Sequence, residues 1–137
     1  MYTTDFWPIV VAAIVSFGIG ALWYSPILFG KEWMSLMNIT DADMTDARTR
    51  GMWKPYLAQF VSTLVMFFVL AFFINAVNAG SAGDGAFLGF LTWLGFIATH
   101  AVGSLAWEKK PFKLVLINTI SALVILVIGG AIIGAWR

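Results

Sequence analysis

The sequence predicts an all-α integral membrane protein, a bundle of four transmembrane helices. The charge pattern carries this prediction: across 137 residues, eight Lys and Arg and seven Asp and Glu leave four uncharged segments, at 6–30, 55–83, 85–107 and 114–136. A helix needs roughly 20 apolar residues to cross the hydrocarbon core of a bilayer, and each segment is longer than that. Composition agrees, because 61% of residues are hydrophobic and only 11% are charged, whereas soluble domains carry about 25% charged residues. We therefore expect residues 1–137 to form a single transmembrane domain.

The first span is predicted over residues 6–29. It has neither the basic start nor the small-residue cleavage pattern of a signal peptide, so we expect it to remain as the first helix. Pro8 suits the first turn of a helix. Pro26 removes a backbone donor and clashes with the preceding turn, so it should kink or end the helix near its inner end.

The segment between the first two spans is the only sizeable extramembrane piece. Trp33 and Met34 predict a short amphipathic stretch on the membrane surface. Thr40 followed by Asp43 is a capping pattern, which predicts a short polar helix that continues to about Arg50.

The remaining spans are predicted over residues 55–77, 85–106 and 112–136. The turn from Asn78 to Asp84 is short and rich in small residues, which forces the second and third spans into an antiparallel hairpin. Pro111 opens the fourth span after an equally tight turn, which gives a second antiparallel hairpin.

The distribution of cations predicts the orientation. Seven of the eight Lys and Arg lie in the loops 30–54 and 107–113, and Arg137 is the only one expected on the other side. Lys and Arg are retained on the cytoplasmic side of the membrane. We expect a multi-pass protein of the bacterial cytoplasmic (inner) membrane with both loops in the cytoplasm and both termini outside.

Small residues recur at helical spacing in three spans and predict helix-packing faces. In lipid, helices associate through close backbone approach and van der Waals contact, which small residues allow. These faces serve either packing inside the bundle or contact between subunits. The predicted packing residues are Gly85, Gly89, Thr92, Gly95, Thr99 and Gly103 in the third span, Ser16 and Gly20 in the first, and Gly130 and Gly134 in the fourth.

Polar residues in the spans are few, and His100 is the most suggestive because it is the only histidine. Ionisable residues within a membrane warrant a functional hypothesis. His100 is a candidate for a proton relay, or for a cofactor ligand when paired with a copy in a second subunit. The alternative is a neutral imidazole bonded to a nearby polar side chain. His100 and Ser104 share one face of the third span, and Asn118 and Ser121 share a face of the fourth, so the two pairs can meet across the second hairpin.

Several function classes find no support. The chain has no cysteine, which excludes disulfides and thiolate metal sites. One histidine is a poor zinc site, because zinc takes three or four protein ligands. A net charge of +1 gives no basic patch for nucleic acid. No catalytic constellation is present, so we expect neither an enzyme nor a cofactor, with membrane lipids and other membrane-embedded chains as the partners.

The most specific block of the sequence is GALWYSPILFGKEWM at residues 20–34. With this block the chain resembles the bacterial membrane family known as domain of unknown function 1761. The resemblance implies four spans and a bacterial origin, and it implies no activity. It continues through Gly95-Phe96, Trp107-Glu108-Lys109-Lys110-Pro111, Lys113-Leu114, Ile117-Asn118 and the ending from Gly130 to Trp136.

These residues support two function hypotheses. The first is a non-enzymatic membrane protein that acts through helix–helix association, as a homo-oligomer or as an accessory subunit of a membrane complex. The second is a small transporter or channel with a pore between protomers, which the absence of Asp and Glu within the spans disfavours. Substrate, oligomeric state and partner are not readable from the sequence. A native mass measurement in mild detergent separates a self-oligomer from a subunit that copurifies with other chains.

Overall fold

The computed structural model describes residues 6–136, and these form helices and no strand. Four helical segments are long and apolar enough to cross a membrane: α1 (Phe6–Trp23), α4 (Trp53–Ala76), the continuous run Ala82–Trp107, and α7 (Phe112–Ala135). The run is divided into α5 (Ala82–Thr92), the π-helical segment η1 (Trp93–Ala98) and α6 (Thr99–Trp107). Two short helices, α2 (Gly30–Leu36) and α3 (Asp41–Arg50), connect α1 to α4. The predicted all-α class, with four helices of spanning length and a helical loop, is confirmed.

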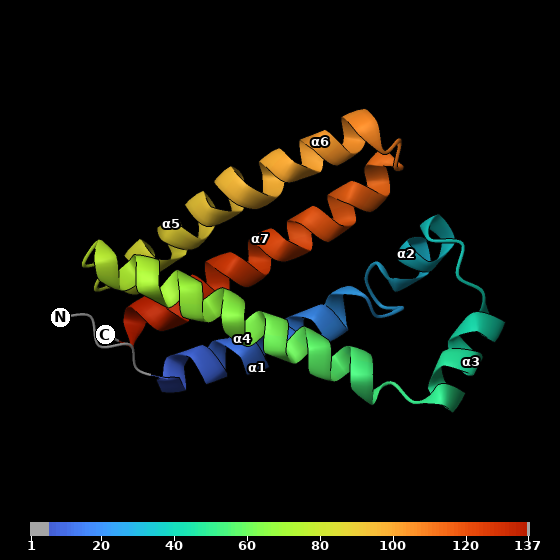
Figure 1. Cartoon of the computed structure of the whole chain (residues 1–137), viewed down its shortest axis with the longest axis horizontal. Helices are drawn as coiled ribbons and strands as arrows, with labels where there is room; N and C mark the ends of the chain where they lie inside the picture. The colour runs from blue at the N-terminus through green and yellow to red at the C-terminus, as the bar shows by residue number, and fades with distance from the viewer. Residues whose placement is uncertain (1–5, 137) are drawn as a thin grey trace.

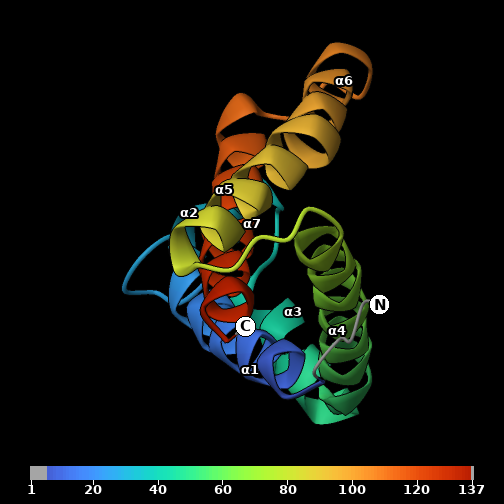
Figure 2. The ribbon, with the colours of Figure 1, turned by 90° about the vertical axis from the view of Figure 1, so that its left-hand side faces the viewer.

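The C-terminal helix α7 is the centre of the bundle (Figure 2). It packs against α5 on one side and α1 on the other, with α4 alongside, and α5 is the element with which it shares the largest contact. The buried core lies where α1, α4 and α7 meet. Its largest fully buried side chains are Phe67, Ile9, Leu70, Ile74 and Leu126.

Helix α1 ends at Trp23, before the predicted end at residue 29. The residue before a proline is disfavoured in the helical conformation, so Pro26 pushes Ser25 out of the helix. The chain then turns back on itself, with the Phe29 N–H donating to the Trp23 carbonyl at 3.0 Å and the Gly30 N–H to the Ser25 carbonyl at 2.8 Å.

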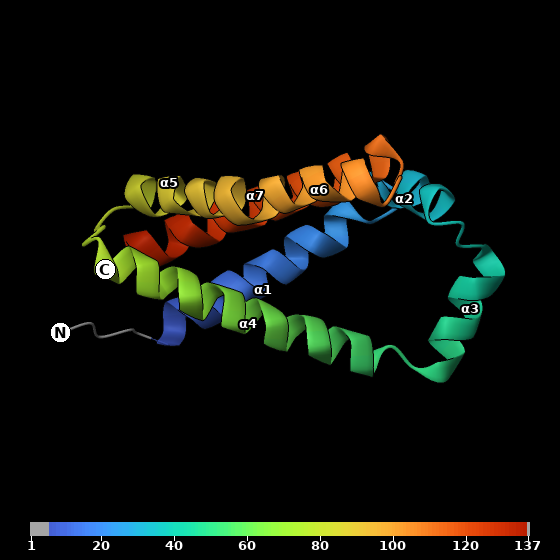
Figure 3. The same ribbon diagram turned by 45° about the horizontal axis from the view of Figure 1, so that its top comes forward.

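The predicted cap of the polar loop helix is present. The Asp43 N–H donates to the Thr40 hydroxyl at 3.1 Å, and the Thr40 N–H donates to the Asp43 carboxylate at 2.9 Å. This reciprocal capping box satisfies two donors that a helix start leaves open. Helix α3 then stands apart from the four long helices (Figure 3).

The charged residues are distributed unequally between the two ends of the bundle. The start of α1, the end of α7 and the turn from α4 to α5 lie at one end, and α2, α3 and the turn from α6 to α7 lie at the other (Figure 1). All seven Lys and Arg of the described residues belong to this second end. At the first end, Asp84 is the only charged residue that the structure describes.

Candidate functional site

The block that comes directly after α1 forms a compact junction at the basic end of the bundle. Trp23 packs against Phe29 with ring centroids 4.8 Å apart, and Tyr24 meets Trp33 edge-on at 5.6 Å. Gly30 is buried so closely that a Cβ there would overlap the Tyr24 carbonyl. Only glycine allows this approach, because it carries no Cβ.

Three side chains fasten this junction to the start of α7. The Trp23 indole N–H donates to the Ile117 carbonyl at 3.1 Å, and the Tyr24 hydroxyl donates to the Asn118 side-chain oxygen at 2.9 Å. Glu32 of α2 pairs with Lys113 at 2.9 Å. These contacts bring the two basic loops together. Each of the two hydrogen bonds, from Trp23 and from Tyr24, joins residues that are 94 positions apart in the sequence.

The small-residue stripe of the third span packs on α7 in its first half. A Cβ on Gly85 would overlap the Gly130 carbonyl, and a Cβ on Gly130 would overlap the Gly85 carbonyl. Gly134 lies against Gly85 and the Ser81 carbonyl, and Gly89 lies against the Leu126 carbonyl. The two backbones therefore touch directly, the kind of close approach that small residues allow between helices in lipid.

The second half of the stripe turns away from α7. Gly95 and Gly103 have open space where a Cβ would stand, and Thr99 is exposed, with its hydroxyl donating to the Gly95 carbonyl at 2.7 Å. This change coincides with η1, and a π turn takes more residues than an α turn and shifts the register of the helix beyond it. Trp93 and Ile97 occupy the face toward the core instead.

Trp93 was not a predicted site residue, yet it fixes the middle of this helix. Its indole N–H donates to the Thr119 carbonyl of α7 at 2.8 Å. A buried Trp usually finds a partner for its N–H, and its mid-span position is the only sequence signal for this contact. A second unpredicted contact places Gly129 against the Phe67 ring, where any Cβ would overlap.

The predicted face of the first span is divided. Ser16 is buried, and its hydroxyl finds no hydrogen-bond partner among the described residues. Gly20, one turn further on, has open space where a Cβ would stand. The Thr92 hydroxyl donates to the Leu88 carbonyl of its own helix at 2.8 Å.

The polar pairs of the second hairpin do not meet as expected. Asn118 accepts from Tyr24, and Ser121 is buried on α7. His100 is exposed, Ser104 is partly buried, and no hydrogen bond links His100 to any described residue. His100 and Ser104 lie in α6, beyond η1.

Two carboxylates at the basic end have lowered pKa values. The Thr40 backbone N–H holds the pKa of Asp43 below its ordinary value, with the Thr40 side chain adding to the effect. Hydrogen bonding and the positive charge of Lys110 lower the pKa of Glu108; the two side chains pair at 2.9 Å. Both carboxylates therefore stay ionised below the pH at which free side chains take up a proton.

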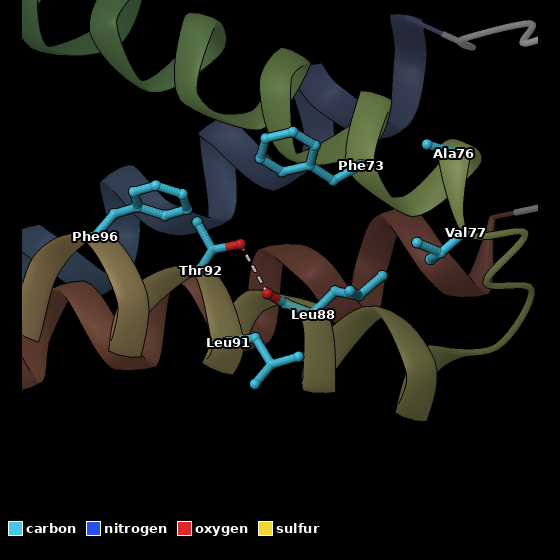
Figure 4. Close-up of a pocket in the computed structure, with 7 residues that line it drawn as sticks. All are labelled: Phe73, Ala76, Val77, Leu88, Leu91, Thr92 and Phe96. Carbon is cyan, nitrogen blue, oxygen red and sulfur yellow. Dashed lines mark hydrogen bonds between the residues drawn. The ribbon is translucent and has the colours of Figure 1, made fainter.

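An apolar groove of about 260 Å³ runs between α4 and the α5–η1 segment. In Figure 4, Phe73 extends from α4 toward Thr92 and Phe96, and the only hydrogen bond drawn joins Thr92 to Leu88. The groove is lined by Phe73, Ala76, Val77, Leu88, Leu91, Thr92 and Phe96.

The protein is therefore helical, with four helices long enough to span a membrane. Direct backbone contacts between α5 and α7 hold these helices together, and so does the aromatic junction after α1, which is bonded to α7. Within residues 6–136, no three His, Asp or Glu side chains gather into a group that could hold a metal. The chain belongs to the family described as protein of unknown function (DUF1761), whose model matches residues 7–134. No curated protein and no solved structure matches the chain.

Proposed function

We propose that this protein is an integral membrane protein that acts through helix–helix association, forming a homo-oligomer or serving as an accessory subunit of a membrane complex. The open face on η1 and α6 carries this proposal. We call it the α6 face and define it by Gly95, Thr99, His100 and Gly103. A Cβ at either of its glycines would meet no atom of the protomer within 4 Å, whereas Gly85 and Gly89 of α5 lie directly against the backbone of α7.

The small residues of the α6 face favour a helix as its partner. Gly95 and Gly103 leave the backbone accessible, which lets a second helix approach closely and gain van der Waals contact. The Thr99 hydroxyl is already bonded within its own helix, so covering it leaves no donor unsatisfied.

His100 adds a polar argument for a covered face. Ionisable side chains in spans almost always face protein or a water-filled cavity rather than lipid. His100 is exposed in the protomer and lies one helical turn from Gly103. A partner helix over Gly103 would bring a hydrogen-bonding group within reach of the imidazole.

The segregated charges support the location that we propose. Lys and Arg next to membrane spans remain in the cytoplasm. All described cations lie at one end of the bundle, where Lys113 and Glu32 tie the two loops together. We place this end in the cytoplasm and both termini outside, in a bacterial cytoplasmic membrane.

Cysteine cross-linking tests the association, because the chain has no native cysteine. Gly103→Cys on the α6 face should give a disulfide-linked dimer when membranes are oxidised. Leu57→Cys, exposed on α4, is the matched control and should remain monomeric.

A native mass measurement of the unmodified protein in mild detergent separates the two forms of the proposal. A multiple of the chain mass indicates a homo-oligomer, and a mass that includes other chains indicates an accessory subunit. A single-chain mass together with equal cross-linking of both cysteine variants contradicts association through this face. The absence of Asp and Glu from the middle of the described spans leaves the transporter hypothesis without an acidic coupling residue.

A further inference from the structure

The Ala82–Trp107 run carries a packing stripe along its whole length but uses only the first half of it. Gly85 and Gly103 are about five turns apart in a regular α-helix, so they would point the same way in an uninterrupted one. In the structure, a Cβ on Gly85 would overlap the Gly130 carbonyl, whereas a Cβ on Gly103 would meet no atom within 4 Å. The two glycines have different surroundings, and η1 lies between them.

The exposure of residues beyond η1 indicates a shift of one residue. Phe87 is exposed on α5, and in an uninterrupted α-helix its column would continue at Ala101 and Leu105, roughly four and five turns further on. Both of these residues are partly buried, and the residue after each, Val102 and Ala106, is exposed instead. One extra residue in the helix accounts for this, because a π turn closes on residue i+5 where an α turn closes on residue i+4.

Helix α6 is attached lightly to the rest of the protomer. Figure 2 shows it beyond α5 and away from α1 and α4, and α7 is the only other long helix that packs against it to any extent. Within residues 6–136, no side-chain hydrogen bond or ion pair joins α6 to another long helix; the Thr99 hydroxyl bonds to the Gly95 carbonyl of its own run. A rotation of α6 about its axis would therefore break no side-chain bond between helices.

The elements on both sides of α6 allow it to rotate alone. Gly85 and Gly89 hold α5 in backbone contact with α7, and Trp93, the first residue of η1, donates to the Thr119 carbonyl. At the other end α6 finishes at Trp107, whose side chain is 87% exposed. Winding or unwinding one residue there loses almost no packing, so the turn to α7 can absorb a shift of one residue.

We propose that η1 is a switch between two registers of α6. In the present register, the extra residue of η1 leaves Gly103 open. In the second register η1 is α-helical, α6 is rotated by about 100°, the angle of one residue, and Thr99 and Gly103 face α7. These small residues then continue the close backbone approach that Gly85 and Gly89 begin. Single π turns within α-helices are often found at functional sites, and a switch of this kind gives η1 such a role.

The second register would close the α6 face, because α7 would cover Thr99 and Gly103. The switch would then regulate the association that we propose for this face. This consequence rests on the proposed function, whereas the two registers concern a single protomer and do not depend on it.

Spin labels on single cysteines report the register of α6, since the chain has no native cysteine. Labels are placed at Ala101, Val102, Leu105 and Ala106 of the full-length protein, in a detergent that dissociates any oligomer. The present register makes positions 102 and 106 the most accessible to oxygen, and the second register transfers this accessibility to positions 101 and 105. We expect the paramagnetic resonance spectra at 101 and 105 to contain a second, more accessible component, populated to about 10%.

Deletion of Leu94, an exposed residue of η1, removes the extra residue and keeps α6 in its present orientation as a regular helix. We expect the second component at Ala101 and Leu105 to disappear in this variant. Leu94→Ala keeps the length of η1 and should retain both components.

A single component at Ala101 and Leu105 in the chain of full length overturns the switch, whether or not the deletion variant folds. Two components that persist after the deletion also overturn it, because they would arise without the extra residue. Neither result bears on association through the α6 face, which the cysteine cross-linking in membranes tests separately.

Discussion

At the scale of single residues, glycine positions distinguish surfaces used within the protomer from those left open. Gly85, Gly89, Gly130 and Gly134 sit where a Cβ would overlap the backbone of a neighbouring helix. Gly95 belongs to the same sequence stripe, yet nothing lies near it. The amino acid is the same in both groups, and only the register of the helix separates them.

Gly89→Ala should therefore destabilise the protein, whereas Gly95→Ala should not. The new Cβ at position 89 meets the Leu126 carbonyl and the Val127 Cα. Overpacking of this kind costs about 1–3 kcal/mol. At position 95 the methyl group enters open space, and replacing glycine by alanine within a helix gains up to about 1 kcal/mol. Thermal unfolding of the single protomer, in a detergent that dissociates any oligomer, should show a lower Tm for the first variant and an unchanged or higher Tm for the second. The opposite order would mean that η1 does not shift the register.

At the scale of elements, local sequence signals predicted where a helix begins better than they predicted its internal geometry. The Thr40 and Asp43 pattern fixed the start of α3 because a capping box needs only neighbouring residues. The four apolar spans were predicted from charge placement. The sequence did not predict η1, because a uniformly apolar stretch from Trp93 to Ala98 carries no periodic mark that distinguishes a π turn from an α turn. Its first residue, Trp93, donates to the Thr119 carbonyl of α7, a tertiary contact that the sequence does not mark.

The bend after α1 offers a test of local against tertiary control. Pro26 keeps Ser25 out of the helix, but the hydrogen bonds and the buried Gly30 hold the chain in its returning path. We expect Gly30→Ala to cost about 1–3 kcal/mol through overlap with the Tyr24 carbonyl, and Pro26→Ala to cost less. The readout is cross-linking by a flexible bis-maleimide between cysteines placed at Glu32 and Lys113, whose side chains meet across the junction. Loss of this cross-link with Pro26→Ala, and its retention with Gly30→Ala, would assign the bend to proline alone.

The cap of α3 gives a pH dependence with a definite sign. The pKa of Asp43 is lowered in the folded protein, first by the Thr40 backbone N–H. The carboxylate therefore stabilises α3 fully above the unfolded pKa of about 3.9, and this contribution disappears as the pH falls through the folded value. NMR chemical shifts of α3 should be constant near neutral pH and move toward unfolded values in acid. Asp43→Asn should weaken the acid transition, and Asp41→Asn, whose side chain is outside the capping box, should retain it.

At the scale of the whole molecule, the tertiary structure brings together charges that are far apart in the sequence. Lys31 and Lys54 lie near the ends of one loop, and Lys109 and Lys110 lie in another. The Trp23, Tyr24 and Glu32 contacts to α7 place both loops at one end of the bundle. The sequence predicted this grouping from the alternation of spans. It could not predict the hydrogen bonds from Trp23 and Tyr24 to α7, because residues 94 positions apart come together only in the folded chain.

This grouping predicts that the end carrying α2 and α3 lies in the cytoplasm. Single cysteines can be introduced without background, since the chain has none. Gly80 is suited to the opposite end because a Cβ there meets nothing, whereas Ser81 caps α5 through the Asp84 N–H at 3.1 Å. Thr49 is exposed on α3 and serves the basic end. On intact cells, a membrane-impermeant thiol reagent should label Gly80→Cys and spare Thr49→Cys, and permeabilised cells should show both labelled. The reverse pattern on intact cells would invert the topology. Labelling of both positions there would mean that the seven described cations do not determine one orientation.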